Sequence, residues 1–232
     1  MRQVPLQLRR LLAPVFLGAI ALLAPGFLAP GLLAPAARAD GEPAGEFDYY
    51  VLSLSWNPSW CAVEGDGRGA PECDGSGDYG FTLHGLWPQY EEGWPQYCRT
   101  RQVDPSRRET AAMADIMGSG GLAWHEWRKH GRCTGLSPVD YFRLSREAYD
   151  RVVRPEIIRR LPREVALPPH VVEEAFLEAN PGLTANGVTI TCRDGYVKEA
   201  RICLTRSLEP RDCAPDTRRD CRASSILMPP VR

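Results

Sequence analysis

Two kinds of periodicity follow a long apolar leader in this chain. Alternating apolar and polar positions predict strands at both ends of the folded region, over residues 47–56, 80–86, 187–192 and 196–205. Between them, apolar residues recur with helical spacing, which predicts helices over residues 106–117, 122–130, 138–160 and 169–179. Strands on either side of a block of helices predict an α+β fold, in which an antiparallel sheet packs with several helices.

Turn-forming residues separate these elements. Residues 57–78 are rich in glycine, proline and aspartate and contain two cysteines, so we expect a loop closed by a disulfide. Residues 87–105 are irregular and rich in aromatic side chains. Ser137 followed by Pro138 is typical of a helix N-terminus. The Arg-Asp-Gly sequence at residues 193–195 predicts a hairpin turn between two strands.

The leader has the pattern of a secretory signal peptide. Arginines precede an apolar run that starts at Leu11 and closes on Ala37-Arg38-Ala39. Prolines interrupt the run every few residues, which makes it a poor membrane-spanning helix. Residues 1–39 are therefore predicted to be a cleaved signal peptide, and residues 40–232 fit a single domain. We expect a secreted or periplasmic monomer that has no membrane association after cleavage.

Net charge argues against a broad polyanion-binding surface. Four of the 28 basic residues and none of the 29 acidic residues lie in residues 1–39, which leaves the mature chain with a charge of −5. Strong salt-dependent binding to nucleic acid needs many cationic contacts. Any nucleic-acid substrate must therefore be held by a local site and by base stacking. Lysine is scarce, and one of the two lysines, Lys129, lies beside a histidine.

All eight cysteines lie in the mature region, behind the predicted export signal, and this favours disulfides. Zinc is the alternative, but there is no Cys-x-x-Cys pair and no spacing typical of a zinc finger or ribbon. Eight cysteines allow about 105 pairings, among which the sequence alone does not choose. Proximity along the chain suggests Cys61–Cys73 and Cys203–Cys213 as local loops.

Three of the four histidines fall in two short segments, Phe81–Pro88 and His125–Cys133. On a helix, residues advance by about 100° each, which places the side chains of the second segment in about 140° of arc. That arc holds four polar groups: His125, Glu126, Lys129 and His130. The two tryptophans of the segment, Trp124 and Trp127, fall on the opposite side, where we expect both to pack against the core.

This combination of side chains suits phosphoryl transfer on RNA. The 2′-hydroxyl of RNA already lies beside its own phosphorus, so a base and an acid are sufficient to cleave the chain. Histidines titrate near neutral pH, so one can be neutral while the other is charged. Lys129 can stabilise the negative charge of the transition state, and Glu126 can orient a cation.

Two other interpretations of the histidines remain. A buried or solvated structural histidine is the ordinary case, and we assign it to His170, at the start of a predicted helix. A zinc site of the His-Glu-x-x-His type is disfavoured because His130 comes five residues after His125, which turns the two rings about 140° apart.

The two histidine segments resemble the two active-site segments of the ribonuclease T2 family. Similarity to that family extends over much of residues 47–213, in residues 47–54, 56–61, 179–183 and 199–204. The resemblance implies an α+β fold and an exported, metal-independent RNA endonuclease with no cofactor. It also implies cleavage of single-stranded RNA through a 2′,3′-cyclic phosphate, with little base specificity. DNA, which lacks the 2′-hydroxyl, should not be cut.

Roles for individual residues follow from matching position in that family. His130 would be the general base and His84 the general acid. His125 would bind phosphate, while Glu126 and Lys129 stabilise the transition state. The family also implies the disulfides Cys98–Cys133 and Cys192–Cys221.

Substrate binding is implied at Trp87, which would stack on a base, and at Gln89 and Tyr90. Gln89, Ser55 and Leu122 depart from the residues frequent in the family, so base preference stays open. An exported binding protein that keeps this fold without cleaving RNA is the alternative function. Loss of a catalytic residue would mark it, and none is lost at the matched positions.

Overall fold

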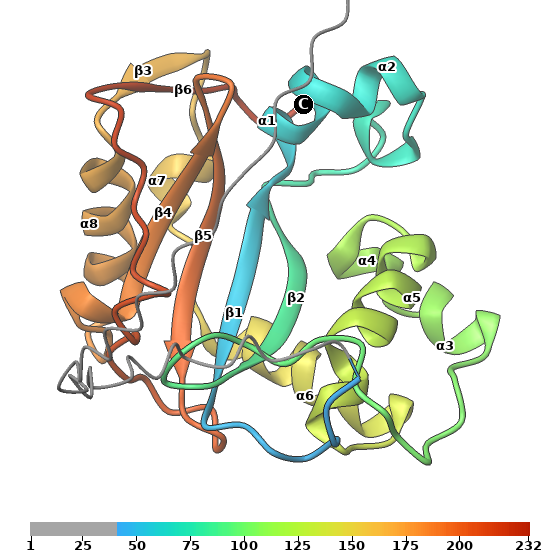
Figure 1. Ribbon diagram of the computed structural model, residues 1–232. Coiled ribbons are helices and arrows are strands. Elements are labelled where there is room, and N and C mark those ends of the chain that lie inside the picture. The colour runs from blue at the N-terminus through green and yellow to red at the C-terminus, as the bar shows by residue number, and fades with distance from the viewer. Residues whose placement is uncertain (1–40) are drawn as a thin grey trace, which may run out of the picture. The chain divides into compact units, whose positions relative to one another are not determined.

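A computed structural model describes residues 41–232, so the predicted signal peptide and its cleavage site lie outside the described residues. The strands form one six-stranded sheet in the order β2-β1-β5-β6-β3, with β4 also pairing with β5; Figure 1 shows how these strands lie in the fold. Every pair of strands is antiparallel except β5 with β6. The predicted α+β fold is confirmed. The strands are β1 (Tyr49–Trp56), β2 (Phe81–Gln89), β3 (Val165–Leu167), β4 (Val188–Arg193), β5 (Tyr196–Leu204) and β6 (Ile226–Met228).

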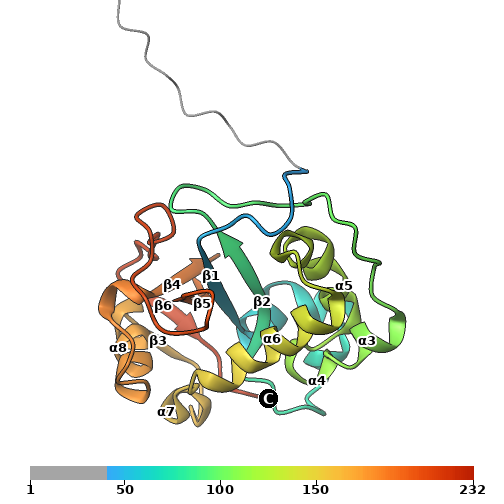
Figure 2. The same cartoon turned by 90° about the horizontal axis from the view of Figure 1, so that it is seen from below.

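Two helices cover the core face of the sheet. Helix α6 (Pro138–Arg151) crosses β1 and β2, and α8 (Pro169–Ala179) lies against β4, as Figure 2 shows from below. Their buried side chains include Tyr141 and Phe142 on α6 and Phe176 on α8. The remaining helices of the described residues are α1 (Asn57–Trp60), α2 (Asp66–Arg68), α3 (Arg107–Ala111), α4 (Ala114–Met117), α5 (Gly120–Lys129) and α7 (Glu156–Arg159).

Strand β1 separates the core from the site because its side chains alternate between the two faces of the sheet. Leu52 and Leu54 belong to the main hydrophobic core. Val51 belongs to a second, smaller cluster on the opposite face, together with the half-buried Trp87. Ser53 follows on that face and is fully buried.

Each strand that flanks this region carries a β-bulge. In the pairing of β1 with β2, Ser53 faces Gly85 while Leu54 faces Leu83, so His84 is an extra residue with no partner. In the pairing of β4 with β5, the extra residue is Lys198. A bulge redirects a side chain that a regular strand would fix. Two irregularities therefore lie near each other on the sheet, and one carries a predicted catalytic histidine.

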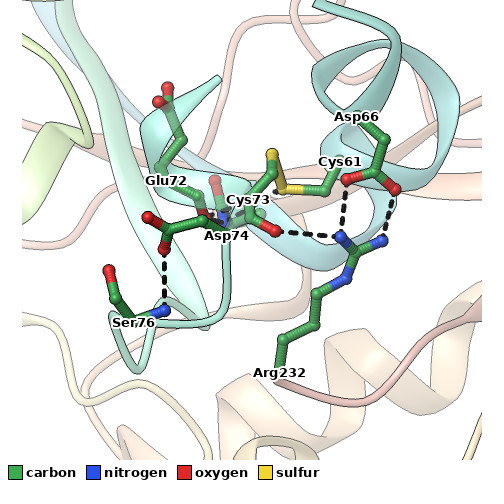
Figure 3. Close-up of a disulfide and its surroundings, with 8 residues drawn as sticks. Cys61, Asp66, Glu72, Cys73, Asp74, Ser76 and Arg232 are labelled. Carbon is green, nitrogen blue, oxygen red and sulfur yellow. Dashed lines mark hydrogen bonds and ion pairs between the residues drawn. A yellow bond between two sulfur atoms is a disulfide. The ribbon is translucent and has the colours of Figure 1, made fainter. Parts of the chain in front are cut away.

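The segment expected to be a loop, residues 57–78, is largely helical. Helix α1, a π-helical turn (Cys61–Gly65), α2 and a 3-10 turn (Pro71–Cys73) follow one another. Figure 3 shows the Cys61–Cys73 disulfide, with Arg232 beside it donating to both carboxylate oxygens of Asp66. These long-range links stabilise short helical turns that the glycine-rich sequence alone does not predict.

Three other elements differ from the sequence predictions. Strand β2 continues to Gln89, so His84 lies in its middle and not near its end. The helix predicted over residues 138–160 ends at Arg151, because Pro155 cannot continue it, and α7 is a separate turn. Strands β3 and β6 were not predicted; they have three residues each and pair with each other although they lie far apart in the chain.

Four disulfides join the cysteines in the pairs expected: Cys61–Cys73, Cys98–Cys133, Cys192–Cys221 and Cys203–Cys213. The bond between Cys98 and Cys133 ties the segment after β2 to the turn that follows α5. Among the residues that the structure describes, no helix is long and apolar enough to cross a membrane.

Candidate active site

Two cavities meet at His84. The larger, of about 450 Å³, extends toward α1 and the β4–β5 hairpin, with Ser55 and Leu122 in its wall. The second, of about 330 Å³, lies over β2, β5 and α5. His84, Lys198 and Glu199 line both cavities. The second cavity holds all but one of the predicted site residues: His84, Trp87, Gln89, His125, Glu126, Lys129 and His130.

Two carboxylates flank the ring of His84. Its Nδ1 lies 2.9 Å from Glu199 Oε1, a hydrogen bond, and its Nε2 lies 3.6 Å from Glu126 Oε1. Both carboxylates are buried, whereas 26% of the His84 side chain is exposed. The histidine is thus fixed at one nitrogen, and the other is available to a substrate.

Helix α5 supplies the second half of the site. Ser119 caps it by accepting a hydrogen bond from Leu122 N, and His130 follows its last residue, Lys129, as the C-cap. The buried side of the helix carries Ala123, Glu126 and Trp127, with His130 also buried.

The prediction that both tryptophans of α5 are packing residues is wrong for Trp124, which is 38% exposed. Trp127 is fully buried, and its Nε1 donates to Asp104 Oδ1. The helix is rotated so that its buried face centres on Glu126 and His130. The wheel shows which residues share a side but not which side faces the protein.

Glycines allow α5 to approach its neighbours. A Cβ at Gly85 would overlap the Glu126 carboxylate and the indole nitrogen of Trp87. One at Gly131 would come within 2.7 Å of Trp127 and 2.8 Å of Tyr141. Both glycines are therefore required for close approach.

Trp87 lies between the two predicted catalytic histidines. Its ring centroid is 5.2 Å from that of His84, edge to face, and 5.1 Å from that of His130, stacked. Its Nε1 donates to Glu126 Oε2 at 2.6 Å. The guanidinium of Arg201 lies 5.2 Å from the ring centroid. The indole thus joins groups from β2, α5 and β5.

The surroundings of His84 favour its charged form. Burial acts to lower the pKa of His84, but the hydrogen bond to Glu199 and the charges of Glu126 and Glu199 outweigh burial and raise it. Burial acts to raise the pKa of Glu199, and the contacts with His84, Arg201 and Lys198 lower it well below its usual range. Both groups are therefore held in their ionised forms.

The surroundings of His130 favour its neutral form. Burial, reinforced by the positive charge of Lys129 and by the other histidines, lowers the pKa of His130 well below its ordinary value. Its Nδ1 is buried without a hydrogen-bond partner, so a charged ring would leave a buried N–H unpaired. His130 is thus kept neutral while His84 is kept charged.

Two ionisable groups on α5, Glu126 and His125, differ in burial. Burial raises the pKa of Glu126, against the opposing effects of His84 and of the Trp87 hydrogen bond. Partial burial and the charge of Lys129 lower the pKa of His125, which is exposed at the mouth of the cavity.

The predicted base-contacting residues lie in different places. Gln89 is buried in the cavity wall, and its Nε2 donates to Pro88 O. Tyr90 does not line either cavity, and its hydroxyl donates to Glu42 Oε2. Trp94, which is 49% exposed, lines the second cavity.

Several site residues were missed by the sequence analysis. They come from β5 and from the segment after it: Lys198, Glu199, Arg201, Asp216 and Arg219. Charged residues in a strand that alternates are usually solvated, so their types gave no signal. The pairing of β5 beside β1 is what brings them to His84.

One group of metal-ligand residue types occurs among the described residues: Cys61, Asp66 and Cys73. The two sulfurs are joined to each other in a disulfide, and Arg232 pairs with the carboxylate. These residues therefore form a structural cluster and do not fit a metal site.

A family model described as the Ribonuclease T2 family matches residues 47–213. The chain belongs to the ribonuclease T2 family. It is 36% identical over 175 residues to a ribonuclease of Aeromonas hydrophila, an alignment that covers 74% of this chain and 77% of that protein.

Solved structures of the family share the fold. An RNase-related protein from Calystegia sepium aligns with a TM-score of 0.64 at 20% identity and covers 79% of this chain and 98% of its own. RNase NT, solved in complex with 5′-AMP, aligns with a TM-score of 0.60 at 23% identity, covering 80% and 99%. Membership of this family supports an RNA endonuclease.

Proposed function

We propose that the protein is an exported endoribonuclease that cleaves single-stranded RNA by acid–base transphosphorylation between two histidines. One observation carries the proposal: His84 and His130 line a single cavity and contact the same indole, and their environments move their pKa values in opposite directions. Paired titratable groups with opposite shifts are the mark of an acid and a base with separate roles.

His130 acts as the general base. In its neutral form it removes the proton of the 2′-hydroxyl, and the 2′-oxygen forms a new bond to the adjacent phosphorus. His84 acts as the general acid, donating a proton from Nε2 to the 5′-oxygen as the P–O5′ bond breaks. The products are a 2′,3′-cyclic phosphate and a free 5′-hydroxyl, and the two histidines have exchanged protonation states.

Lys129, His125 and Glu126 assist from the same helix. Lys129 lies in the cavity wall, where its charge stabilises the negative oxygens of the phosphorane. His125, at the cavity mouth, contacts a phosphate oxygen. Glu126 holds Trp87 through a buried hydrogen bond and places negative charge near His84 Nε2.

The substrate is single-stranded RNA, read with little base specificity. Aromatic rings at the second cavity, Trp87 and Trp94, offer stacking faces that accept every base. A mature net charge of −5 argues against a broad cationic surface of the kind that holds a duplex. DNA lacks the nucleophilic hydroxyl and is not cut.

No metal takes part in this scheme, because the histidines supply the base and the acid and Lys129 supplies the positive charge. Cleavage should therefore continue at an unchanged rate in EDTA. A loss of activity that added divalent ions restore would contradict this part of the proposal.

Export follows from the leader pattern together with four disulfides. The mature enzyme is then a secreted or periplasmic monomer beginning at Asp40. Amino-terminal sequencing of the protein from the periplasm and medium tests the cleavage position.

Replacement of either histidine tests the mechanism. His84→Phe and His130→Phe should each abolish cleavage of single-stranded RNA, with circular dichroism and melting temperature showing that the fold is kept. His170→Phe is the matched control, because His170 is exposed at the start of α8 and lines neither cavity. Full activity in either test variant would refute the assignment.

A binding protein that retains the fold without catalysis is the second candidate. The wild-type protein separates the two, since an RNA-binding protein would retain homopolymer RNAs uncut. Identification of 2′,3′-cyclic termini among the products would support the enzyme.

A further inference from the structure

Glu199 is a buried carboxylate that the mechanism above does not use. It lies on β5 with 0% of its side chain exposed, and it lines both cavities. A charge taken out of water is costly unless other groups compensate for it. Its contacts therefore show what the charge does in this position.

Three groups compensate this carboxylate, and one of them is His84. Oε1 accepts from His84 Nδ1 at 2.9 Å and lies 3.1 Å from Lys198 Nζ. Oε2 accepts from Arg201 Nε at 2.9 Å and from Nη2 of the same guanidinium at 2.7 Å. One oxygen is thus anchored to β5 itself, while the other reaches the histidine.

The backbone brings the two side chains together from strands on either side of β1. Glu199 pairs with Ser55 of β1, and His84 is the extra residue of the bulge between β2 and β1. Lys198, the extra residue of the second bulge, lies next to Glu199 in the chain and lines the same cavities. The first bulge therefore supplies the histidine, and the regular pairing of β5 with β1 supplies the carboxylate.

We propose that Glu199 is the positioning residue for the general acid: it fixes the ring of His84 through Nδ1 and keeps that ring charged, so that Nε2 delivers the proton to the leaving group. This inference rests on the proposed function for the role of His84 as acid. Glu199 touches no substrate atom and acts only through the histidine.

The hydrogen bond between His84 and Glu199 determines which ring nitrogen of His84 keeps its proton. Because Nδ1–H donates to Glu199, the neutral ring left after proton transfer has its lone pair on Nε2. That atom is 3.6 Å from Glu126 Oε1, too far for a good hydrogen bond, so it is open to substrate. The arrangement matches the general rule that a carboxylate behind a histidine sets its tautomer and orientation.

Arg201 and Lys198 act on the carboxylate, although the charge of Lys198 also lowers the pKa of His84 to a smaller extent than the two carboxylates raise it. Their positive charges favour the ionised form of Glu199, so the carboxylate does not take the Nδ1 proton. Other charged or titratable groups also face the cavities around His84, and each contributes to its titration. They are His125, Glu126 and Lys129 on α5, His130 at its C-cap, Asp216 and Arg219 after β5, and Glu64, Arg68, Glu72, Arg193 and Tyr196 at the larger cavity.

The first test is Glu199→Gln, which keeps the shape of the side chain and removes its charge. An opposite charge within hydrogen-bond distance moves a pKa by about 1–3 units. We expect the pKa of His84, followed by NMR, to fall by at least about one unit. The alkaline limb of the kcat/KM profile should move to lower pH by the same amount, with KM nearly unchanged.

Two variants serve as controls. Glu199→Asp retains the negative charge and should keep most of the elevation of the His84 pKa. Glu209→Gln removes a glutamate that pairs with Arg151 on the surface, away from the cavities, and should leave the profile unchanged. The four histidines of the chain make the NMR assignment tractable by single substitutions.

A second test uses the wild-type protein alone, so it does not depend on whether a variant folds. Above the pKa of His84, its ¹⁵N shifts should report the tautomer protonated at Nδ1. The opposite tautomer, or a folded Glu199→Gln protein whose His84 titrates as in the wild type, would overturn the proposal. A uniform loss of rate at all pH values would also overturn it, because that indicates only a structural role.

These readouts separate the two proposals. NMR titration and tautomer measurements are made without RNA, so they test the link between Glu199 and His84 even in a protein that cuts nothing. A wild-type protein that fails to cleave RNA contradicts the proposed function. An altered His84 titration in Glu199→Gln would still establish the pairing.

Discussion

His84 and His130 carry the same side chain into two unlike environments. One ring is held between two buried carboxylates, and the other is buried beside a lysine with one nitrogen unpartnered. Two side chains of the same type are therefore suited to two different roles, acid and base. The division comes from groups that exchange no proton with the substrate: Glu199 and Glu126 beside His84, and burial together with Lys129 at His130.

The pH dependence of cleavage should reflect this division. Activity requires neutral His130 and charged His84, so it is lost below the pKa of the first and above the pKa of the second. Since one pKa is lowered and the other raised from the usual value of about 6.5, the plateau should include that pH. A kcat/KM profile whose alkaline limb lies well below pH 6.5 would contradict the environment of His84.

Gly85→Ala should damage the site from the backbone. The added Cβ would overlap the Glu126 carboxylate and the Trp87 indole, which are joined by a buried hydrogen bond. We expect a loss of about 1–3 kcal/mol in unfolding free energy and about a 10- to 100-fold loss of kcat.

Gly67→Ala is the control for that experiment. Gly67 lies in α2, and a Cβ there would meet nothing within 4 Å. Its stability and activity should stay near those of the wild type. Equal losses in both variants would show that overlap at position 85 is not the cause.

At the scale of elements, β2, β5 and α5 build the site. The sequence predicts the bounds of some elements of the fold more accurately than those of others. The bounds of α8 agree with the prediction because prolines mark its start and Asn180 follows its end. Strand β2 was cut short, since a proline at position 88 reads as a strand end, although β2 is an edge strand where proline is tolerated.

The sequence could not show which side of α5 faces the protein, or how β5 aligns with the strands beside it. A helical wheel grouped the polar residues of α5, yet only packing shows that Trp124 faces outward. Similarly, the type of residue at position 199 did not reveal its role. Its contact with His84 depends on β5 pairing with β1 and on a bulge, and both are set by residues distant in the chain.

Helix α8 offers a test of stability against pH. Burial and the neighbouring Asp220 raise the pKa of Glu173 to about 7, above its unfolded value of about 4.5. A raised carboxyl pKa contributes stability at low pH that is lost as pH rises through about 7. Glu173→Gln should therefore be more stable than the wild type at pH 8, by about 1 kcal/mol because solvent screens a half-buried group, with little difference at pH 4.

Thermal melts at several pH values measure this difference. Glu174→Gln is the matched control, because that residue is the exposed neighbour on the same helix. A Glu173→Gln protein whose advantage does not grow from pH 4 to pH 8 would count against the raised pKa.

For the whole molecule, disulfides hold segments that the core does not bury. The Cys98–Cys133 bond spans 35 residues and anchors the turn that follows His130. The Cys203–Cys213 bond spans 10 residues. Chain entropy ranks the first as the more stabilising, at about 4 against about 3 kcal/mol.

Replacing each pair with alanine and unfolding in urea tests this order. Loss of Cys98–Cys133 should lower the midpoint further, and it should reduce activity at temperatures where the core is still folded, because the end of α5 is freed. A larger loss from the Cys203–Cys213 pair would show that native packing outweighs loop entropy here.

The bulge at His84 has a consequence for how such a protein could lose its chemistry. A version of β2 shortened by that single position could run beside β1 in unbroken register, with Leu83 and Gly85 adjacent in the ladder. The pairing of β2 with β1 therefore does not require the additional residue. The additional residue is His84 itself, the proposed general acid, so a one-residue deletion there should yield an inert protein with a more regular sheet.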